Sequence, residues 1–289
     1  MRPLRPARSV VLLAVARTVL VGAGLMAAGF SPAAAQVSAA SASGHAAAAG
    51  GYLSGARIEA LAQAVPAPSA DGSGAQIADR ALSERYRGYE NGDRWLLATA
   101  HADVSPKLAA QHFDCALGVR FASAPTPRLT ALFDKLLKDA NEAAETAKAL
   151  AFRPRPVGVN PERPACQTVS AAGRNSPSYP SGSAAVGTVY GEAVAVLDPS
   201  HAGAAREIGH QIAVSRAVCG MHYPADVAAG ETLGKAVFAE VAADPAFAAD
   251  IEAARVELAA VRATGLTNPG CVAEAAALAL PLPPSSPGV

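Results

Sequence analysis

The chain has 289 residues, of which 51% are hydrophobic, 17% are charged and 5% are aromatic, and its formal net charge is zero. This composition can bury an ordinary hydrophobic core, so the chain as a whole is not of the intrinsically disordered class. A neutral chain lacks the basic surface that binds nucleic acids, and few aromatic side chains are available to stack on single strands. We therefore expect no nucleic acid polymer as a partner.

The first 35 residues have the pattern of a secretory signal peptide. Three arginines lie near the start: Arg2, Arg5 and Arg8. An apolar stretch follows over 18–30, and the small residues just after it predict cleavage after Ala35. Arg17 interrupts the apolar stretch, which weakens the alternative of a retained membrane anchor. We therefore expect a periplasmic or secreted protein without stable membrane insertion.

The rest of the chain divides by composition into a leader, one domain and a tail. Residues 36–75 are rich in Ala, Ser and Gly and predict a flexible leader, whereas the proline-rich 281–289 predict a disordered tail. Residues 76–280 contain no internal repeat and no second linker. They are expected to form a single domain.

The domain has the apolar spacing of helices and the capping and proline residues that begin and end them. Thr126-Pro127 begins a run in which apolar residues recur every three or four positions up to Lys148. Further helices are predicted at 181–197, from 202 to about 219, at 224–244 and at 245–263. No alternating apolar run is long enough to demand a sheet, so the fold class is predicted to be an all-α single helical bundle.

Export would place the four cysteines in an oxidising compartment. They are Cys115, Cys166, Cys219 and Cys271. An even number there suggests two disulfides, with three pairings that the sequence leaves open, and buried free thiols are the alternative. None of them has the CxxC spacing of a zinc site, and we expect no metal.

Three polar patterns lie at the predicted helix ends. Lys148 ends one helix, and the prolines on both sides of Arg155 force an extended exit from it. In the second pattern, Ser181-Gly182 opens the next helix, where free backbone N–H groups converge as they do in anion sites. Each feature alone has an ordinary explanation, because cations are favoured at helix C-termini and serine is a common N-cap.

The third pattern is formed by Arg216, His222 and Asp226. Pro224 would begin a helix whose first turn holds Asp226, within reach of the His222 imidazole. A carboxylate fixes the tautomer of such a histidine and leaves its other nitrogen as a base or nucleophile, although a surface histidine beside a capping Asp is the ordinary alternative. Combined with the first two patterns, these groups suit a tetrahedral oxyanion attacked by histidine.

These patterns resemble, in order and spacing, the signature of the type 2 phosphatidic acid phosphatase superfamily, which includes the vanadium haloperoxidases. The matching motifs are Lys148-x6-Arg155-Pro156, Pro180-Ser181-Gly182 and Ser215-Arg216-x5-His222-x3-Asp226. Across about 80–265, "AKALAFRPRP" and "SRAVCGMHYPADVAAG" are most similar to bacterial class A non-specific acid phosphatases, and "RWLLATAHAD" and "FDCALGV" resemble their early helices. The resemblance implies an all-α bundle that hydrolyses small phosphate monoesters without metal or cofactor, and a homo-oligomer stays open.

The resemblance also implies a role for each matching residue. His222 would attack phosphorus to form a phosphohistidine, and Asp226 would orient His222. The remaining positions would bind the phosphoryl oxygens: Lys148, Arg155, Ser181, the backbone N–H of Gly182, and Arg216.

Ser183 departs from the pattern of the family. The family has a histidine there that protonates the leaving alcohol, whereas a serine hydroxyl titrates too high to act as an acid. The absence of this histidine should lower the rate roughly 10²- to 10⁴-fold. The enzyme could still hydrolyse aryl phosphates, another group or a water could supply the proton, or the chain could be a phosphate-binding pseudoenzyme. Halide oxidation is less expected, because that site also uses this histidine.

Overall fold

The structure, a computed structural model, describes residues 50–284. The expected signal peptide and the leader as far as residue 49 lie outside the described residues, as do residues 285–289 of the expected tail. Between residues 50 and 284 every regular element is an α-helix or a 3-10 helix and none is a strand. The predicted all-α bundle is therefore confirmed.

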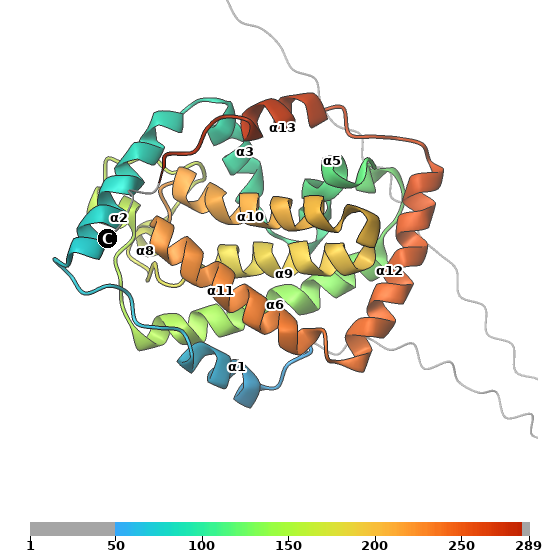
Figure 1. Ribbon diagram of the computed structural model, residues 1–289, viewed down its shortest axis with the longest axis horizontal. Coiled ribbons are helices and arrows are strands. Elements are labelled where there is room, and N and C mark those ends of the chain that lie inside the picture. Colours follow the sequence, from blue (N-terminus) through green and yellow to red (C-terminus); the bar gives the residue numbers. More distant parts are fainter. Residues whose placement is uncertain (1–49, 285–289) are drawn as a thin grey trace, which may run out of the picture. The chain divides into compact units, whose positions relative to one another are not determined.

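Five long helices form the body of the bundle (Figure 1). They are α6 (Pro127–Leu150), α9 (Gly182–Leu197), α10 (Ala202–Val218), α11 (Pro224–Val241) and α12 (Pro245–Ala263). All five begin and end within one turn of the predicted bounds. Shorter helices surround them: α1 (Gly55–Gln63), α2 (Gly74–Arg85), α3 (Asp93–His101), α4 (Pro106–Ala109), α5 (Asp114–Leu117), α7 (Pro156–Val159), α8 (Ala171–Arg174) and α13 (Cys271–Leu278).

Helix α9 is the centre of the bundle and contacts α6, α10, α11 and α12. It is buried along almost its whole length and consists mainly of small residues. Glycines allow α9 and α10 to run close together: a Cβ on Gly209 would stand 2.6 Å from the carbonyl oxygen of Gly187. The close packing of small residues fixes the ends of these helices relative to one another.

Part of the expected leader is helical. The composition predicts flexibility across 36–75, but α1 lies inside this segment and packs against α6 and α11. Ser54 caps α1 by accepting a hydrogen bond from the Arg57 N–H, and Ile58 and Ala62 are buried. The physical reason for the difference is that an Ala-rich segment of low complexity is also an excellent helix former once one face can be buried.

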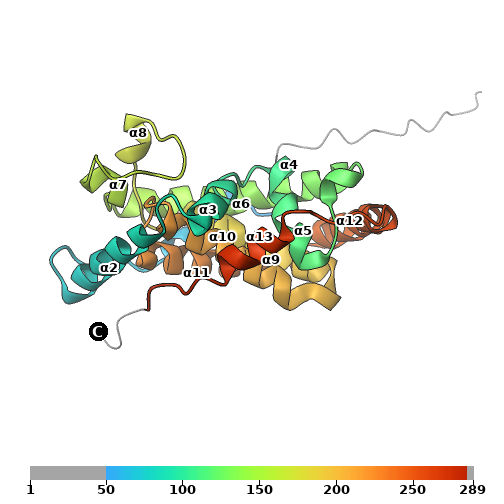
Figure 2. The same ribbon diagram turned by 90° about the horizontal axis from the view of Figure 1, so that it is seen from above.

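Two disulfides form, and the structure settles their pairing. Cys115 pairs with Cys271, which ties α13 to α5, and Cys166 pairs with Cys219 at the end of α10. The second bridge anchors the long connection between α6 and α9. In Figure 2 this connection, with α7 and α8, stands at one end of the bundle.

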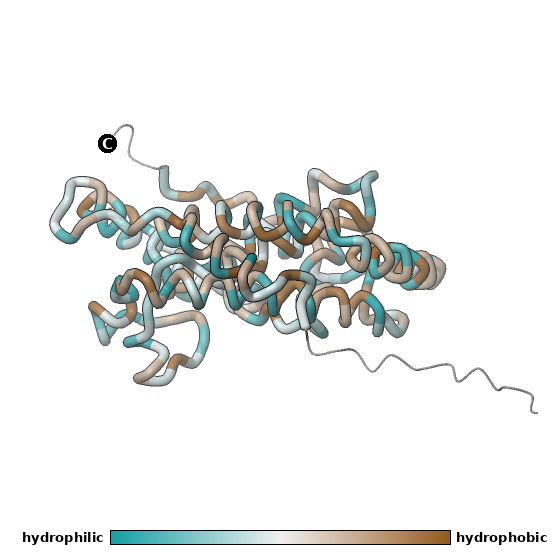
Figure 3. Tube along the Cα trace, turned by 90° about the horizontal axis from the view of Figure 1, so that it is seen from below, coloured by the Kyte–Doolittle hydropathy of each residue, from teal (hydrophilic) through white to brown (hydrophobic). Residues whose placement is uncertain are grey.

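Hydrophobic and hydrophilic residues are interspersed along the helices (Figure 3). Among residues 50–284, no helix has both the length and the apolar character needed to cross a membrane. Residues 281–284 have no regular structure, as their prolines predict, but Arg85 and Tyr89 donate hydrogen bonds to their carbonyl groups.

Candidate active site

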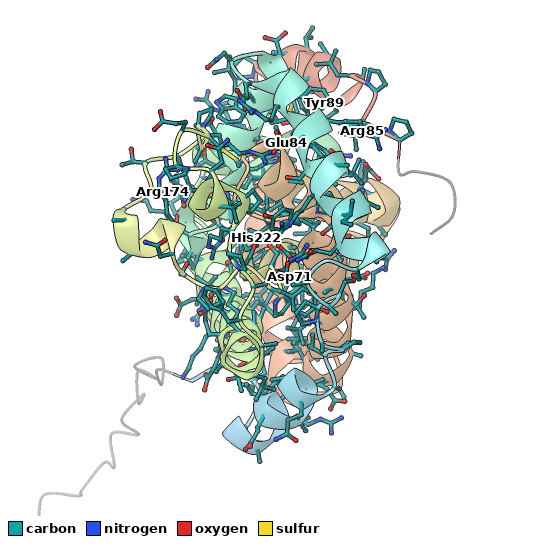
Figure 4. The ribbon with its side chains drawn as sticks, turned by 90° about the vertical axis from the view of Figure 1, so that its left-hand side faces the viewer. Asp71, Glu84, Arg85, Tyr89, Arg174 and His222 are labelled. Atoms are coloured by element: carbon teal, nitrogen blue, oxygen red, sulfur yellow. A yellow bond between two sulfur atoms is a disulfide. The ribbon has the colours of Figure 1, made fainter. Side chains whose placement is uncertain are left out.

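Four helix ends meet at one end of the bundle: the C-terminal ends of α6 and α10 and the N-terminal ends of α9 and α11. Figure 4 looks onto this end and labels His222, which lies in the turn between α10 and α11. Gly220 makes the turn possible with a left-handed φ of 68°. The N–H groups of Met221 and His222 then both reach the carbonyl oxygen of Arg216, at 3.1 and 3.3 Å. This turn brings Arg216 and His222 together.

His222 is held in one orientation and is 2% exposed. Its Nδ1 lies 2.7 Å from the carbonyl oxygen of Ser178, which can only accept, so Nδ1 carries the proton. The other nitrogen, Nε2, is therefore unprotonated, and its lone pair accepts a hydrogen bond from an Arg155 N–H at 2.9 Å. Burial lowers the pKa of His222 well below its usual value, and the charges of Arg155, Arg216 and Lys148 lower it further. The imidazole is thus held in its neutral form.

Three buried cations act on the His222 imidazole: Lys148, Arg155 and Arg216. Arg155 is fixed by Ser176 Oγ at 3.0 Å and by the Met221 carbonyl oxygen at 3.1 Å, and Arg216 is fixed by Gln167 Oε1 at 3.1 Å. Burial lowers the pKa of all three groups, and burial together with the charge of Arg155 brings the pKa of Arg216 to about 10. So many buried cations at one place favour binding of an anion.

An unsatisfied donor points to the same conclusion. Within residues 50–284, Nε of Arg216 is the one buried side-chain nitrogen or oxygen without a hydrogen-bond partner. A buried donor that lacks a partner costs about 1–3 kcal/mol, and a bound oxyanion would remove that cost.

The N-terminus of α9 completes the cradle. Ser181 is its N-cap and accepts a hydrogen bond from the Ala184 N–H at 3.3 Å, and the Ser181 N–H in turn donates to the carbonyl oxygen of Asp226 at 2.9 Å. A Cβ on Gly182 would stand 3.6 Å from Lys148 Nζ, so the glycine leaves space beside this cation. The orphan N–H groups of the helix start therefore lie next to the cationic cluster.

Asp226 does not bond His222 directly. The four-residue spacing predicts a carboxylate–imidazole contact, but Oδ2 of Asp226 lies 3.9 Å from Nδ1, beyond hydrogen-bond range. Instead, the Ser178 hydroxyl donates to Asp226 Oδ2 at 2.6 Å and lies 3.3 Å from Nδ1. Asp226 therefore reaches His222 through Ser178.

Arg153 and Ser178 are the site residues that the sequence analysis missed. Arg153 is buried between Asp226 and Asp79, with both ion-pair distances 2.6 Å, and stacks 4.2 Å from the centre of the Tyr223 ring. The repeated Arg-Pro pair in "FRPRP" was a signal that could have indicated Arg153. Nothing in the sequence singles out Ser178, whose partners lie 44 and 48 residues away.

The remaining predicted position, Ser183, is half-buried in the first turn of α9. Four other histidines are bound to groups of their own: His101 to Ser215 Oγ, His112 to the Asp103 carbonyl, His201 to Asp198 and His210 to Glu231. No three His, Cys, Asp or Glu residues in the described part of the chain are grouped as metal ligands. The site as built consists of three buried cations, the N-terminus of α9 and one neutral imidazole.

Curated proteins of known activity are similar to this chain, although no model of a protein family matches it. An acid phosphatase of Zymomonas mobilis is 31% identical over 201 residues, which are 69% of this chain and 76% of that protein. A non-specific acid phosphatase of Salmonella typhimurium is 30% identical over 60% of this chain and 70% of its own length. A non-specific acid phosphatase of Providencia stuartii is 26% identical over 68% of this chain and 80% of its own length.

Proposed function

The chain belongs to the acid phosphatase family, and on that premise we propose that it is an exported phosphatase that hydrolyses phosphate monoesters through a phosphohistidine. The observation that carries the proposal is the neutral Nε2 of His222 facing three buried cations. Catalysis of phosphoryl transfer consists mostly of positioning and charge stabilisation, which these groups supply without a metal. The signal-peptide pattern of residues 1–35 supports export to the periplasm or the medium.

In the first step, the Arg155 N–H that contacts Nε2 turns to a phosphoryl oxygen of the bound ester. The released lone pair of His222 Nε2 attacks phosphorus, and the bond from phosphorus to the ester oxygen breaks. The phosphoryl oxygens lie against Lys148, Arg155 and Arg216 and against the N–H groups at the start of α9. The Ser178 carbonyl keeps the proton on Nδ1 while Nε2 forms its bond to phosphorus. In the second step, a water oxygen bonds to phosphorus as the water gives up a proton. The Nε2–phosphorus bond breaks, its electron pair returns to Nε2, and phosphate leaves.

Ser183 sets the substrate range in this proposal. A serine hydroxyl cannot protonate the departing alcohol, so hydrolysis of alkyl esters needs a proton from another group, and without one it loses the roughly 10²- to 10⁴-fold that a positioned acid contributes. Aryl esters need little protonation because a phenolate leaves readily. The same residue favours a second candidate function, a catalytically weak or inactive protein that binds phosphate or phosphoesters.

Hydrolysis of 4-nitrophenyl phosphate and glycerol phosphate by the purified mature chain tests the proposal. We expect aryl turnover that His222→Ala abolishes, and a phosphoenzyme that forms in the wild type alone. Ser183→Ala should change little, whereas Ser183→His should accelerate hydrolysis of the alkyl ester. Phosphate or vanadate binding without hydrolysis of either ester would refute the phosphatase and favour the binding protein.

A further inference from the structure

A carboxylate lies at the mouth of the proposed phosphate site. Glu145 is on α6, one turn before Lys148, and its carboxylate is 2.5 Å from Lys148 Nζ. The Lys148 side chain is 7% exposed, whereas that of Glu145 is 56% exposed. Lys148 Nζ borders Gly182 at the start of α9, and Ser183 is the next residue. The ion pair therefore extends from the buried Lys148 Nζ, next to the start of α9, to the exposed Glu145 carboxylate.

Two carboxylates interact with the cationic cluster, and only one can face a leaving group. Both Asp226 and Glu145 act on the charge of Arg155. Asp226 is fully buried on the far side of the His222 ring, where Arg153 and Ser178 occupy its oxygens. In an in-line displacement the leaving oxygen departs opposite the attacking Nε2, which is buried, so it departs toward solvent. Of the two carboxylates, Glu145 is the one exposed to solvent, and it contacts Lys148 Nζ.

We propose that Glu145 is the proton donor that replaces the missing acid at Ser183, an inference that rests on the proposed phosphatase function. Lys148 is one of the cations proposed to bind the phosphoryl oxygens, and it contacts the Glu145 carboxylate directly. An ester bound against Lys148 therefore lies within reach of Glu145.

The proton then makes one full cycle. As the Nε2–phosphorus bond forms and the phosphorus–oxygen ester bond breaks, the electron pair goes to the ester oxygen, which takes the proton of Glu145 and leaves as an alcohol. In the second step the Glu145 carboxylate accepts a proton from water while the water oxygen bonds to phosphorus. The nitrogen–phosphorus bond breaks, its electron pair returns to Nε2, and Glu145 is again protonated.

Glu145→Gln removes the proton and keeps the shape of the side chain. We expect kcat/KM for glycerol phosphate to fall roughly 10²- to 10⁴-fold, with less than about a tenfold fall for 4-nitrophenyl phosphate. Across a series of aryl phosphates, the dependence of log kcat/KM on the acidity of the leaving phenol should steepen. The 4-nitrophenyl ester should release a burst of phenol, because the second step also loses its base. Glu142→Gln, at an exposed position on the same helix, is the matched control and should behave as wild type.

Rescue separates proton donation from pairing with Lys148. Ser183→His in the Glu145→Gln background should restore glycerol phosphate hydrolysis. If Glu145→Gln changes both esters by the same factor, or only through KM, Glu145 merely holds Lys148 and this inference is wrong while the phosphatase proposal stands. If the wild type hydrolyses neither ester, or His222→Ala leaves aryl turnover intact, the proposed function fails and this inference fails with it.

Discussion

Replacing Gly230 by alanine tests whether α11 sets the position of the phosphate cradle. Gly230 lies one turn after Asp226 on α11, where a Cβ would stand 2.3 Å from the carbonyl oxygen of Ser181 and 2.9 Å from Ala184 Cβ. Both distances are far below van der Waals contact. The oxygen belongs to the backbone and cannot rotate away, so α11 or the start of α9 must move.

Two opposing terms decide the magnitude. Alanine in place of glycine inside a helix gains about 1 kcal/mol of intrinsic propensity. Overpacking a well-packed contact costs about 1–3 kcal/mol, and a clash with a backbone atom belongs at the upper end of that range. The net expectation is a loss of about 1–2 kcal/mol, or a Tm lower by roughly 2–8 °C for a domain of this size. A shift of a few tenths of an ångström at Ser181 should also lower kcat/KM about tenfold.

Thermal unfolding followed by circular dichroism, with the disulfides intact, measures the change in Tm. Aryl phosphate hydrolysis measures the change in kcat/KM. Gly203→Ala is the control, because Gly203 lies in α10 with no atom within 4 Å of the position that its Cβ would take. That variant should be unchanged or slightly stabilised and fully active. A Gly230→Ala protein as stable as wild type would refute the packing argument. A variant that is destabilised but fully active would show that α11 does not set the position of the cradle.

The remaining predictions concern charge and covalent links. Arg153→Met leaves two buried carboxylates unpaired and should cost about 3–5 kcal/mol in urea unfolding. Because the pKa of His222 is lowered in the folded state, only the unfolded state takes up its proton as pH falls below 6.5, so stability falls by about 1.4 kcal/mol per pH unit. The pKa of His101 is lowered to about 3, so His101 adds an equal fall in unfolding free energy per pH unit between pH 6.5 and 3. His222→Gln should therefore halve the pH dependence that the two histidines produce together, as measured by urea unfolding at several pH values. Replacing Cys115 and Cys271 by serine opens a loop of 156 residues and should cost roughly 4–5 kcal/mol, measured as a lower Tm.

The long helices could be predicted because the information that defines them is local. Proline opens α6, α11 and α12, the Ser181 cap opens α9, and apolar spacing fills the interiors. Helix α1 could not be predicted in this way, since its Ala-rich sequence becomes a stable helix only through burial against α6 and α11. Local sequence predicts a helix well when capping residues or prolines mark its ends. It predicts a helix poorly when tertiary contacts supply the stability of that helix.

The same distinction holds for the candidate site. Lys148, Arg155, Arg216 and His222 each lie at or beside a helix end, and the resemblance of their motifs to those of the phosphatase superfamily predicted that they share one site. The contacts of Arg153 span 73 and 74 residues, and no spacing rule relates such distant partners. Side chains such as Arg153, which support the site through contacts between distant parts of the sequence, can therefore be identified only in the folded chain.

Arg153 also explains why His222 can remain neutral beside a carboxylate. An unpaired Asp226 next to the ring would favour the imidazolium form, yet Asp226 Oδ1 is paired with Arg153 and its Oδ2 accepts from Ser178 and from the Tyr223 N–H. The charge that could stabilise a proton on His222 is thus already neutralised. Burial and the three cations then outweigh the hydrogen bond to the Ser178 carbonyl, which acts in the opposite direction, and the pKa of His222 stays well below its usual value.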